Sequence, residues 1–268
     1  MYESYWGLHT KPFENTPDPK FFYASSQHQE ACARMLYGIR SRKGAGVLTG
    51  VFGCGKTIVG QVVLHELNQE RYRCALLSNP RVNDLDVLRL ITYHLGVAHP
   101  PGNKADVLIA LEELVTSHAK EGRDTVILLD EAHAIEDPKV FEELRLLLNF
   151  QWHDRFLVTL LLFGQPELAT MINANKAFEQ RVGIKSRLEP MTLGETHDYI
   201  YHRLRVAGQE QPEEIFGPET ISLLYESTGG IPRRINRLCD ICLLAGFGMQ
   251  VRTIEPGIVA DEVQGLAV

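Results

Sequence analysis

The chain has 268 residues, of which 44% are hydrophobic and 23% charged, and its formal net charge is −7. These values are typical of a globular protein with one substantial core and a smaller second unit, and they exclude a largely disordered chain. The acidic balance excludes a protein that grips nucleic acid over its whole surface but leaves room for a local basic patch. No apolar run approaches the roughly 20 residues of a membrane span, so we expect no direct membrane insertion.

Two further features predict a cytoplasmic protein. The first six residues lack the basic and then apolar pattern of a secretory signal. The five cysteines are odd in number and lie mostly inside apolar runs, which fits a reducing compartment. Cys239 and Cys242 form a single CxxC inside a helical pattern. We interpret them as core residues rather than a metal or redox site.

Residues 1–43 are predicted to form an N-terminal strap and helix, packed on the core. The strap, up to Tyr23, is aromatic and rich in turns, and prolines at 12, 17 and 19 exclude a helix there. Two partners are open for its aromatic rings, namely the flat face of a nucleotide base and the protein core. Ser26 then caps an amphipathic helix.

The stretch GVFGCGKT at 50–57 carries the clearest chemical signal. Two glycines separated by four residues and followed by Lys and Thr form a phosphate-binding pattern, and here it lies between an apolar strand and a helix. The glycines let backbone N–H groups approach an anion, and the helix start adds further donors. Lys56 reaches the outer phosphates, and the Thr57 hydroxyl binds Mg²⁺. The predicted nucleotide-binding residues are Gly50, Val51, Phe52, Gly53, Cys54, Gly55, Lys56, Thr57 and Ile58.

Cys54 within this loop has two interpretations. Loop N–H groups and the neighbouring Lys56 would favour its reactive thiolate form, so that alkylation inactivates the protein. Alternatively it is a small residue that the loop tolerates.

Apolar runs then alternate with amphipathic helical patterns. Strands are expected at 74–78, 125–129, 156–163 and 186–191, and helices at 84–95, 106–120 and 140–150. Together with a strand at 47–49, they predict an α/β fold in residues 44–191, a three-layer sandwich with a five-stranded parallel sheet. Asn103-Lys104-Ala105-Asp106 matches the guanine-reading pattern of GTPases, but it follows a Pro-Pro-Gly loop. We interpret it as a capped helix start.

Polar side chains follow two of these strands. Asp130 and Glu131 end the run Thr125 to Leu129, where ligands bind in open α/β sheets. Asp130 suits a contact to Mg²⁺, and Glu131 is placed to polarise the attacking water. Gln165 is the first polar side chain after the strand at 156–163, and it is a candidate for contact with the γ-phosphate.

Beyond residue 192 the strand signals stop. Segments 195–207, 218–227, 231–248 and 255–266 all read as helices, which predicts a helical lid domain over 192–268. One of these helices starts with Arg233, Arg234 and Arg237. Without a ligand, such a cluster is a solvated basic face.

A phosphate loop, a separate acidic strand and a helical lid in this order resemble the AAA+ ATPases. Gly230-Ile231-Pro232-Arg233 is similar to the lid motif whose arginine reads the nucleotide, so the resemblance makes Arg233 the candidate second sensor. Gln165 falls at the first sensor, where Asn, Ser or Thr is usual. Asn79 matches the position that restrains the catalytic glutamate when no partner is bound.

The resemblance also implies an arginine finger that enters a neighbouring subunit's site. Arg181 and Arg187 are both candidates, and we prefer Arg181. One departure from the AAA+ pattern is Ala132-His133 after the acidic pair. The resulting sequence, Asp-Glu-Ala-His, also occurs in a class of helicases. Since those enzymes need a second motor domain that contains strands, we interpret His133 as an ordinary early-helix residue.

Several N-terminal motifs narrow the resemblance to the general secretion pathway protein A family. They are Tyr5-Trp6-Gly7-Leu8, Lys11-Pro12-Phe13 and Thr16-Pro17-Asp18-Pro19, supported by Leu162 to Leu168. In that family a membrane span and a peptidoglycan-binding region usually follow the ATPase domain, whereas this sequence stops after the lid, either because that region was removed or because it never existed.

The resemblance implies a Mg²⁺-dependent ATPase that forms a homo-oligomer, a ring or a filament, with ATP sites at its interfaces. It would act as a motor or switch for an envelope assembly through a protein partner. The alternative is an ATP-dependent DNA-binding regulator of the transposition-helper type, for which the arginine cluster leaves room.

Overall fold

The computed structural model describes residues 1–153 and 155–266, which divide into two compact units. The first, here called the sheet unit, comprises residues 27–52 and 59–188. The second, the helical unit, comprises residues 1–26, residues 53–58 and the chain from Glu189 onward.

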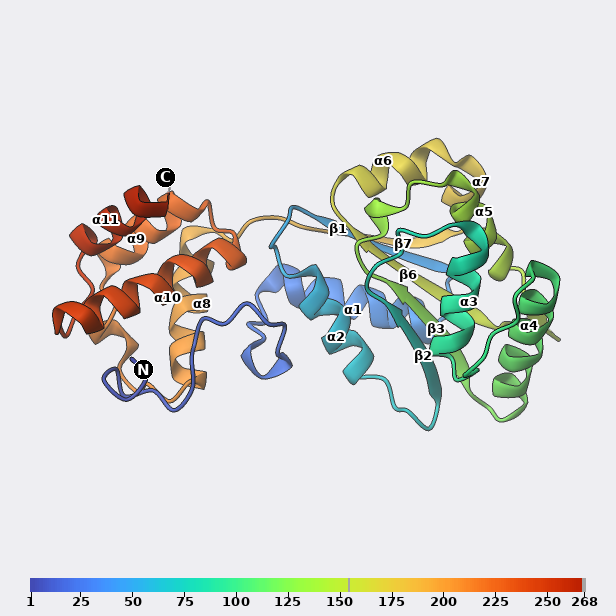
Figure 1. Cartoon of the computed structure of the whole chain (residues 1–268), viewed down its shortest axis with the longest axis horizontal. Coiled ribbons are helices and arrows are strands. Elements are labelled where there is room, and N and C mark those ends of the chain that lie inside the picture. The colour runs from blue at the N-terminus through green and yellow to red at the C-terminus, as the bar shows by residue number, and fades with distance from the viewer. Residues whose placement is uncertain (154, 267–268) are drawn as a thin grey trace. The chain divides into compact units, whose positions relative to one another are not determined.

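The sheet unit is built on five parallel strands in the order β2-β3-β6-β1-β7 (Figure 1). Three of them, β1, β3 and β6, are buried at every residue and are mostly apolar in sequence, as expected of strands covered on both faces. The predicted α/β fold with its five-stranded parallel sheet is therefore confirmed. The strands are β1 (Ala45–Gly50), β2 (Tyr72–Leu77), β3 (Asp124–Leu129), β6 (Val158–Gly164) and β7 (Val182–Leu188).

Helices cover both faces of the sheet. On one face lie α1 (Ser26–Arg40) and α2 (Lys56–His65), where Gly38 approaches Ile184 and Gly60 approaches Phe163. The other face carries the larger apolar core, which includes Val47, Leu129 and Leu162. The helices that pack into this core are α3 (Asp84–His94), α4 (Lys104–Lys120), α5 (Pro138–Leu147), α6 (Glu167–Ala174) and α7 (Lys176–Glu179).

The structure corrects several boundaries along the sheet unit. The fifth strand lies at 182–188 rather than 186–191. The prediction misplaced it because its residues up to 187 alternate between half-buried and exposed at the sheet edge and form no apolar run. A short hairpin of β4 (Gln151–Trp152) and β5 (Arg155–Phe156) precedes β6, so β6 begins two residues later than predicted. The short helices α6 and α7 were not predicted from the sequence.

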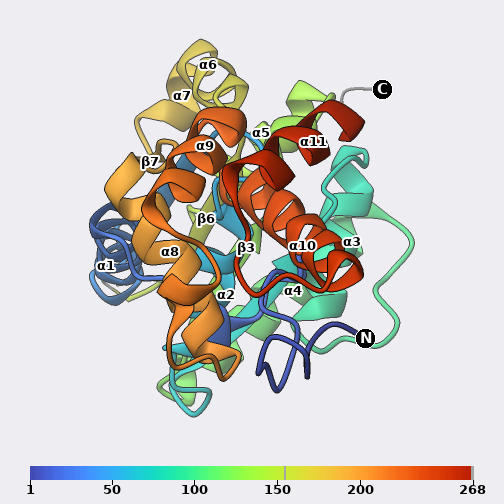
Figure 2. The ribbon, with the colours of Figure 1, turned by 90° about the vertical axis from the view of Figure 1, so that its left-hand side faces the viewer.

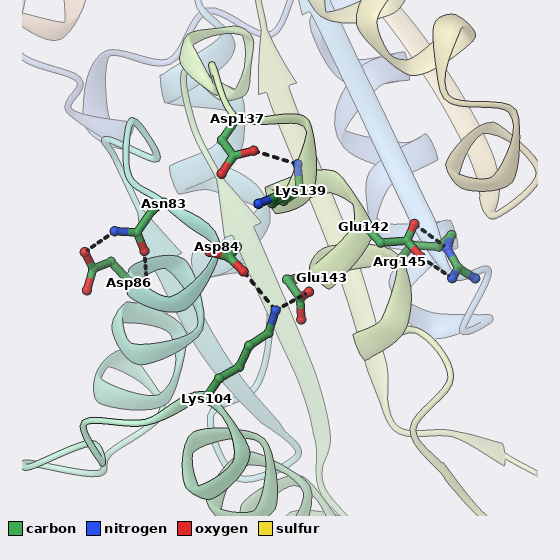
Figure 3. A network of polar contacts seen from close by, with 9 residues as sticks. All are labelled: Asn83, Asp84, Asp86, Lys104, Asp137, Lys139, Glu142, Glu143 and Arg145. Carbon is green, nitrogen blue, oxygen red and sulfur yellow. Dashed lines mark hydrogen bonds and ion pairs between the residues drawn. The ribbon is translucent and has the colours of Figure 1, made fainter.

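Polar contacts join the helices α3, α4 and α5 (Figure 3). Asn103 accepts a hydrogen bond from the backbone N–H of Asp106 at 3.0 Å, which confirms that this segment is a helix cap. The next residue, Lys104, places its Nζ 2.8 Å from Asp84 Oδ2 and 2.7 Å from Glu143 Oε1. One ammonium group thus joins the three helices.

The helical unit contains α8 (Leu193–Val206), α9 (Pro218–Thr228), α10 (Pro232–Met249) and α11 (Pro256–Leu266), seen together in Figure 2. The first begins with a capping box, in which Thr192 and Glu195 satisfy each other's backbone N–H groups. Cys239 and Cys242 are fully buried in α10, and burial raises the pKa of the Cys242 thiol to about 12. Among the described residues no group of three or more His, Cys, Asp or Glu side chains could hold a metal ion.

The aromatic strap belongs to the core of the helical unit. Tyr2, Trp6 and Phe13 are almost fully buried there, and the Trp6 indole N–H donates to the Leu243 carbonyl at 2.9 Å. The prediction that prolines exclude a helix from the strap is wrong at one place, the 3-10 helix η1 (Pro19–Phe21). Proline is tolerated at a first helical position because its missing N–H would have no partner inside the helix. The predicted N-terminal segment 1–43 is therefore divided, since the strap packs with the lid helices and α1 packs with the sheet. None of the helices in residues 1–153 and 155–266 is both long and apolar enough to cross a membrane.

Candidate nucleotide site

The loop from Gly50 to Thr57 connects β1 directly to α2, as the phosphate-binding pattern predicts. Gly53 and Gly55 have φ angles of +86° and +97°, a region that other residues rarely adopt. Within the helical unit, the Gly53 carbonyl accepts a hydrogen bond from the backbone N–H of Arg233 at 3.3 Å. A Cβ on Gly53 would lie 2.8 Å from Arg233 Cβ, so only glycine fits. The candidate second sensor is thereby brought against the loop.

Lys56 and Cys54, which also belong to the loop, are buried. Lys56 is 4% exposed and Cys54 is completely covered. The burial of Cys54 differs from the accessible, reactive thiol considered above, because reactive cysteines are partly exposed. The second interpretation, a small residue that the loop tolerates, is the one that its environment favours.

The loop leaves the sheet at the edge where the acidic pair lies. Thr49 of β1 pairs with Gly164 of β6, and Leu162 of β6 pairs with Leu129 of β3. Because these neighbouring strands are parallel, the residues that follow them lie along one edge. Gly50, Asp130 and Gln165 are those residues.

Asp130 is held firmly at this edge. Its backbone N–H donates to the Leu77 carbonyl at 2.8 Å, and its Oδ1 accepts from the Glu131 N–H at 2.9 Å. The residue is 5% exposed. A buried carboxylate at the carboxyl end of a strand supplies the hard oxygen donor that Mg²⁺ prefers.

Glu131 has a left-handed backbone, with φ at 54° and ψ at 33°. For a residue with a Cβ this conformation costs on the order of 1–2 kcal/mol. The Asp130 carboxylate and the Ala134 N–H, which donates to the Glu131 carbonyl at 2.8 Å, hold it there. The Glu131 side chain is 38% exposed, so water can reach its carboxylate.

His133 is the functional candidate that the sequence interpretation missed. It lies in the 3-10 helix η2 (Ala132–Ala134), not in an ordinary α-helix. Its Nε2 is 2.8 Å from the side-chain amide nitrogen of Gln165 and 3.5 Å from Glu131 Oε2. The sequence Asp-Glu-Ala-His was the one available signal for His133. Because the comparison with helicases failed, His133 was interpreted as a residue without a functional role.

Comparison with known proteins now decides the family. A family model described as an AAA domain matches residues 39–172, half of the chain. The chain belongs to the AAA domain family. Its glycine loop and its acidic strand end both fall inside the matched residues.

One curated relative resembles nearly the whole length of this AAA protein. The chain is 35% identical to the General secretion pathway protein A of Aeromonas hydrophila over 275 residues, which cover 99% of this chain and 49% of the relative. The resemblance indicated by the sequence motifs is thus confirmed. The chain spans about half the length of that relative.

Solved structures share the AAA+ fold. The ORC2 protein of Aeropyrum pernix, solved as ADPNP-ADP complexes, has a TM-score of 0.73 at 16% identity and covers 95% of this chain and 71% of its own. Drosophila ORC bound to DNA has a TM-score of 0.70 at 17% identity, with 96% and 64% covered. At such identities the likeness shows the fold alone.

Asn79, the expected restraint on the catalytic glutamate of this AAA protein, follows β2 and is exposed. Its Oδ1 accepts a hydrogen bond from the Arg81 N–H at 3.2 Å. The side chain thus stabilises its own turn, and its action on Glu131 stays a prediction.

The two candidate arginine fingers lie at opposite ends of β7. Arg181 precedes the strand, and its guanidinium donates to Asn149 Oδ1 at 2.7 Å. Arg187 pairs with Thr49 near the carboxyl edge and lines a cavity of about 360 Å³ with Arg34 and other residues of the sheet unit. A strand rises about 3.3 Å per residue, so Arg181 is about 20 Å from the edge that carries Asp130.

Proposed function

We propose that this AAA protein is a Mg²⁺-dependent ATP hydrolase whose sites are completed by neighbouring copies of the chain. The observation that carries the proposal is the acidic pair, with a buried Asp130 and a partly exposed Glu131 at the sheet edge where the glycine loop begins. The buried carboxylate suits metal binding, and the partly exposed carboxylate next to it suits the orientation of water.

The residues fit a nucleotide with its metal. Positive φ angles at Gly53 and Gly55 give the loop a backbone that other residues rarely adopt, and its N–H groups together with Lys56 would bind phosphate oxygens. Thr57 and Asp130 supply hard oxygen ligands for Mg²⁺. When bound, Mg²⁺ neutralises charge on the transferred phosphoryl group.

The other residues of the chain position the reaction. Glu131 orients the attacking water, and Gln165 contacts the γ-phosphate. Arg233, whose backbone lies against Gly53 of the loop, is the residue that would read the bound nucleotide. Arg181 acts in the neighbouring copy, since within the sheet unit it lies at the edge remote from Asp130. Such an arginine contributes on the order of 10³–10⁵ in rate in comparable enzymes.

The test is turnover measured with binding. Glu131→Gln should bind ATP with wild-type affinity and hydrolyse it at least about 100-fold more slowly, whereas Lys56→Ala should lose binding. Unchanged hydrolysis by Glu131→Gln removes that residue from the mechanism. Arg181→Ala alone should be slow, and mixing it with Lys56→Ala protein should restore part of the activity if the sites are shared. No rescue in the mixture contradicts an interface site.

The biological role proposed for this ATPase is that of a motor or switch for an envelope assembly, located in the cytoplasm and acting through a protein partner. The similarity to a general secretion pathway protein and the net charge of −7 support this role. The experiment is co-purification from membranes of the source cell with and without ATP. Recovery of secretion, pilus or export proteins supports it, and their absence from both preparations contradicts it.

A second candidate role is an ATP-dependent DNA-binding regulator. Arg233, Arg234 and Arg237 are exposed at the start of α10, and one structure with the same fold is described as bound to DNA. Binding to double-stranded DNA at two salt concentrations separates the roles, because phosphate contacts give a steep salt dependence. Loss of binding in Arg234→Ala would favour the regulator.

A further inference from the structure

The His133 side chain occupies the space between the two residues proposed to sense and to use the γ-phosphate. Its Nδ1 lies 3.3 Å from the backbone N–H of Gln165, and its Nε2 lies 2.8 Å from the Gln165 side-chain amide nitrogen. The same Nε2 is 3.5 Å from Glu131 Oε2. One ring therefore touches both Gln165 and Glu131, which are 34 positions apart in the chain.

The hydrogen-bond network assigns the proton on this ring. A neutral imidazole has one N–H and one lone pair in its plane, so it accepts at only one nitrogen. Assigning the Gln165 backbone N–H as the donor to Nδ1 places the ring proton on Nε2. Two acceptors compete for that proton, the amide oxygen of Gln165, once the amide is turned towards the ring, and the carboxylate of Glu131.

The backbone around His133 is built for this close approach. The preceding residue, Ala132, is fully buried, and the His133 side chain is 18% exposed. At Gly164, the last residue of β6, a Cβ would lie 3.1 Å from the backbone nitrogen of His133 and 2.9 Å from Leu168 Cδ2. A side chain at 164 would therefore push the η2 turn away from Gln165.

We propose that His133 is a positioning residue that reports the state of Gln165 to Glu131. This inference rests on the proposed ATPase function. Without a γ-phosphate, the Gln165 amide is turned so that its oxygen accepts a hydrogen bond from His133 Nε2–H, and the Glu131 carboxylate has no bond to the ring. When Gln165 turns to the γ-phosphate, Nε2–H donates to Glu131 instead and fixes the carboxylate that orients the water. The switch exchanges one hydrogen bond for another and transfers no proton.

The primary experiment compares variants of the whole chain. His133→Ala should lower kcat about 10- to 100-fold, the loss expected when a catalytic group is displaced by about 1 Å. Its dissociation constant for a non-hydrolysable ATP analogue, measured by calorimetry, should stay within about twofold of wild type. His99→Ala is the matched control, because His99 is exposed in a loop, and it should leave kcat unchanged.

Two amide variants separate a hydrogen-bond role from a packing role. His133→Gln places an N–H donor near the position of Nε2 and should retain kcat within about fivefold of wild type. His133→Asn places its amide near Nδ1, too short to reach Glu131, and should be as slow as His133→Ala. Equal activity of the two amide variants overturns the proposal. Melting temperatures confirm that each variant is folded, and if His133→Ala is not, this pair alone decides.

A double-mutant cycle tests the link to Gln165. If His133 acts through Gln165 and Glu131, His133→Ala with Gln165→Ala should be no slower than the slower single variant, within about twofold. Losses that multiply overturn the link, as does a His133→Ala kcat within twofold of wild type. If wild-type protein hydrolyses no more ATP than Lys56→Ala, the proposed function fails instead, and the two failures are thereby distinguished.

Discussion

Removing the ammonium group that joins α3, α4 and α5 tests what holds the sheet unit together. Lys104→Met keeps the length and the helix propensity of the side chain but removes its charge. Two carboxylates then lose their partner. The Asp84 side chain is 27% exposed and can be hydrated, whereas that of Glu143 is 7% exposed and already has one oxygen without a hydrogen bond. Glu143 therefore determines the cost.

The size of the effect follows from the charge that the substitution leaves unpaired. Removing one partner of a buried ion pair costs about 3–5 kcal/mol. This range is an upper limit here, because the Lys104 side chain is 40% exposed and water screens part of the original interaction. We therefore expect a loss of about 2 kcal/mol at pH 7. The hydrogen bond from Lys104 lowers the pKa of Asp84, so the loss should be smaller below about pH 4.

The assay is urea unfolding at pH 7 and at about pH 3. Lys139→Met is the matched control, since Lys139 is an exposed lysine of α5 (Figure 3) and should change stability by less than about 0.5 kcal/mol. Adding Glu143→Gln to Lys104→Met removes the unpaired charge and should restore most of the loss. A loss that is equal at the two pH values, or below about 0.5 kcal/mol at pH 7, refutes this account of the network.

Three further predictions concern stability and reactivity. The hydrogen bond from Lys104 lowers the pKa of Asp84, so the stability that Asp84 contributes is present above about pH 4 and is lost as acid protonates the carboxylate. The hydrogen bonds to Asp84 and Glu143 raise the pKa of Lys104, so the stability that Lys104 contributes is present up to about pH 10 and is lost above it. Stability curves of wild type and Lys104→Met should converge at both extremes, and parallel curves would contradict this. Gly230→Ala should lower the melting temperature strongly, since its Cβ would lie 2.0 Å from the Met191 carbonyl oxygen at a φ of +68°, and an unchanged melting temperature would contradict it. Cys54, fully buried, should react with iodoacetamide only upon unfolding, and rapid labelling of native protein would restore the reactive-loop hypothesis.

Features with a local cause were predictable from the sequence. Continuous apolar runs identified β1, β3 and β6, because a strand covered on both faces needs no polar alternation. The helix cap at Asn103 follows from the hydrogen-bonding reach of one side chain. The glycine loop and the acidic strand end were visible for the same reason, since their residues are adjacent in the chain.

Features that depend on distant partners were decided by the tertiary structure. The edge strand β7 had no apolar run to reveal it, because its residues alternate between half-buried and exposed. The partner of the aromatic strap was open until Trp6 and Phe13 were seen in the helical core.

His133 shows the same limit at the proposed site. Its type and spacing fit an ordinary helix start, and only the pairing of β3 with β6 brings Gln165, 32 positions further along the chain, to its ring. The sequence alone therefore predicted which groups would bind and polarise phosphate. The fold determined which of them touch, because hydrogen bonds require a proximity that one-dimensional spacing does not encode.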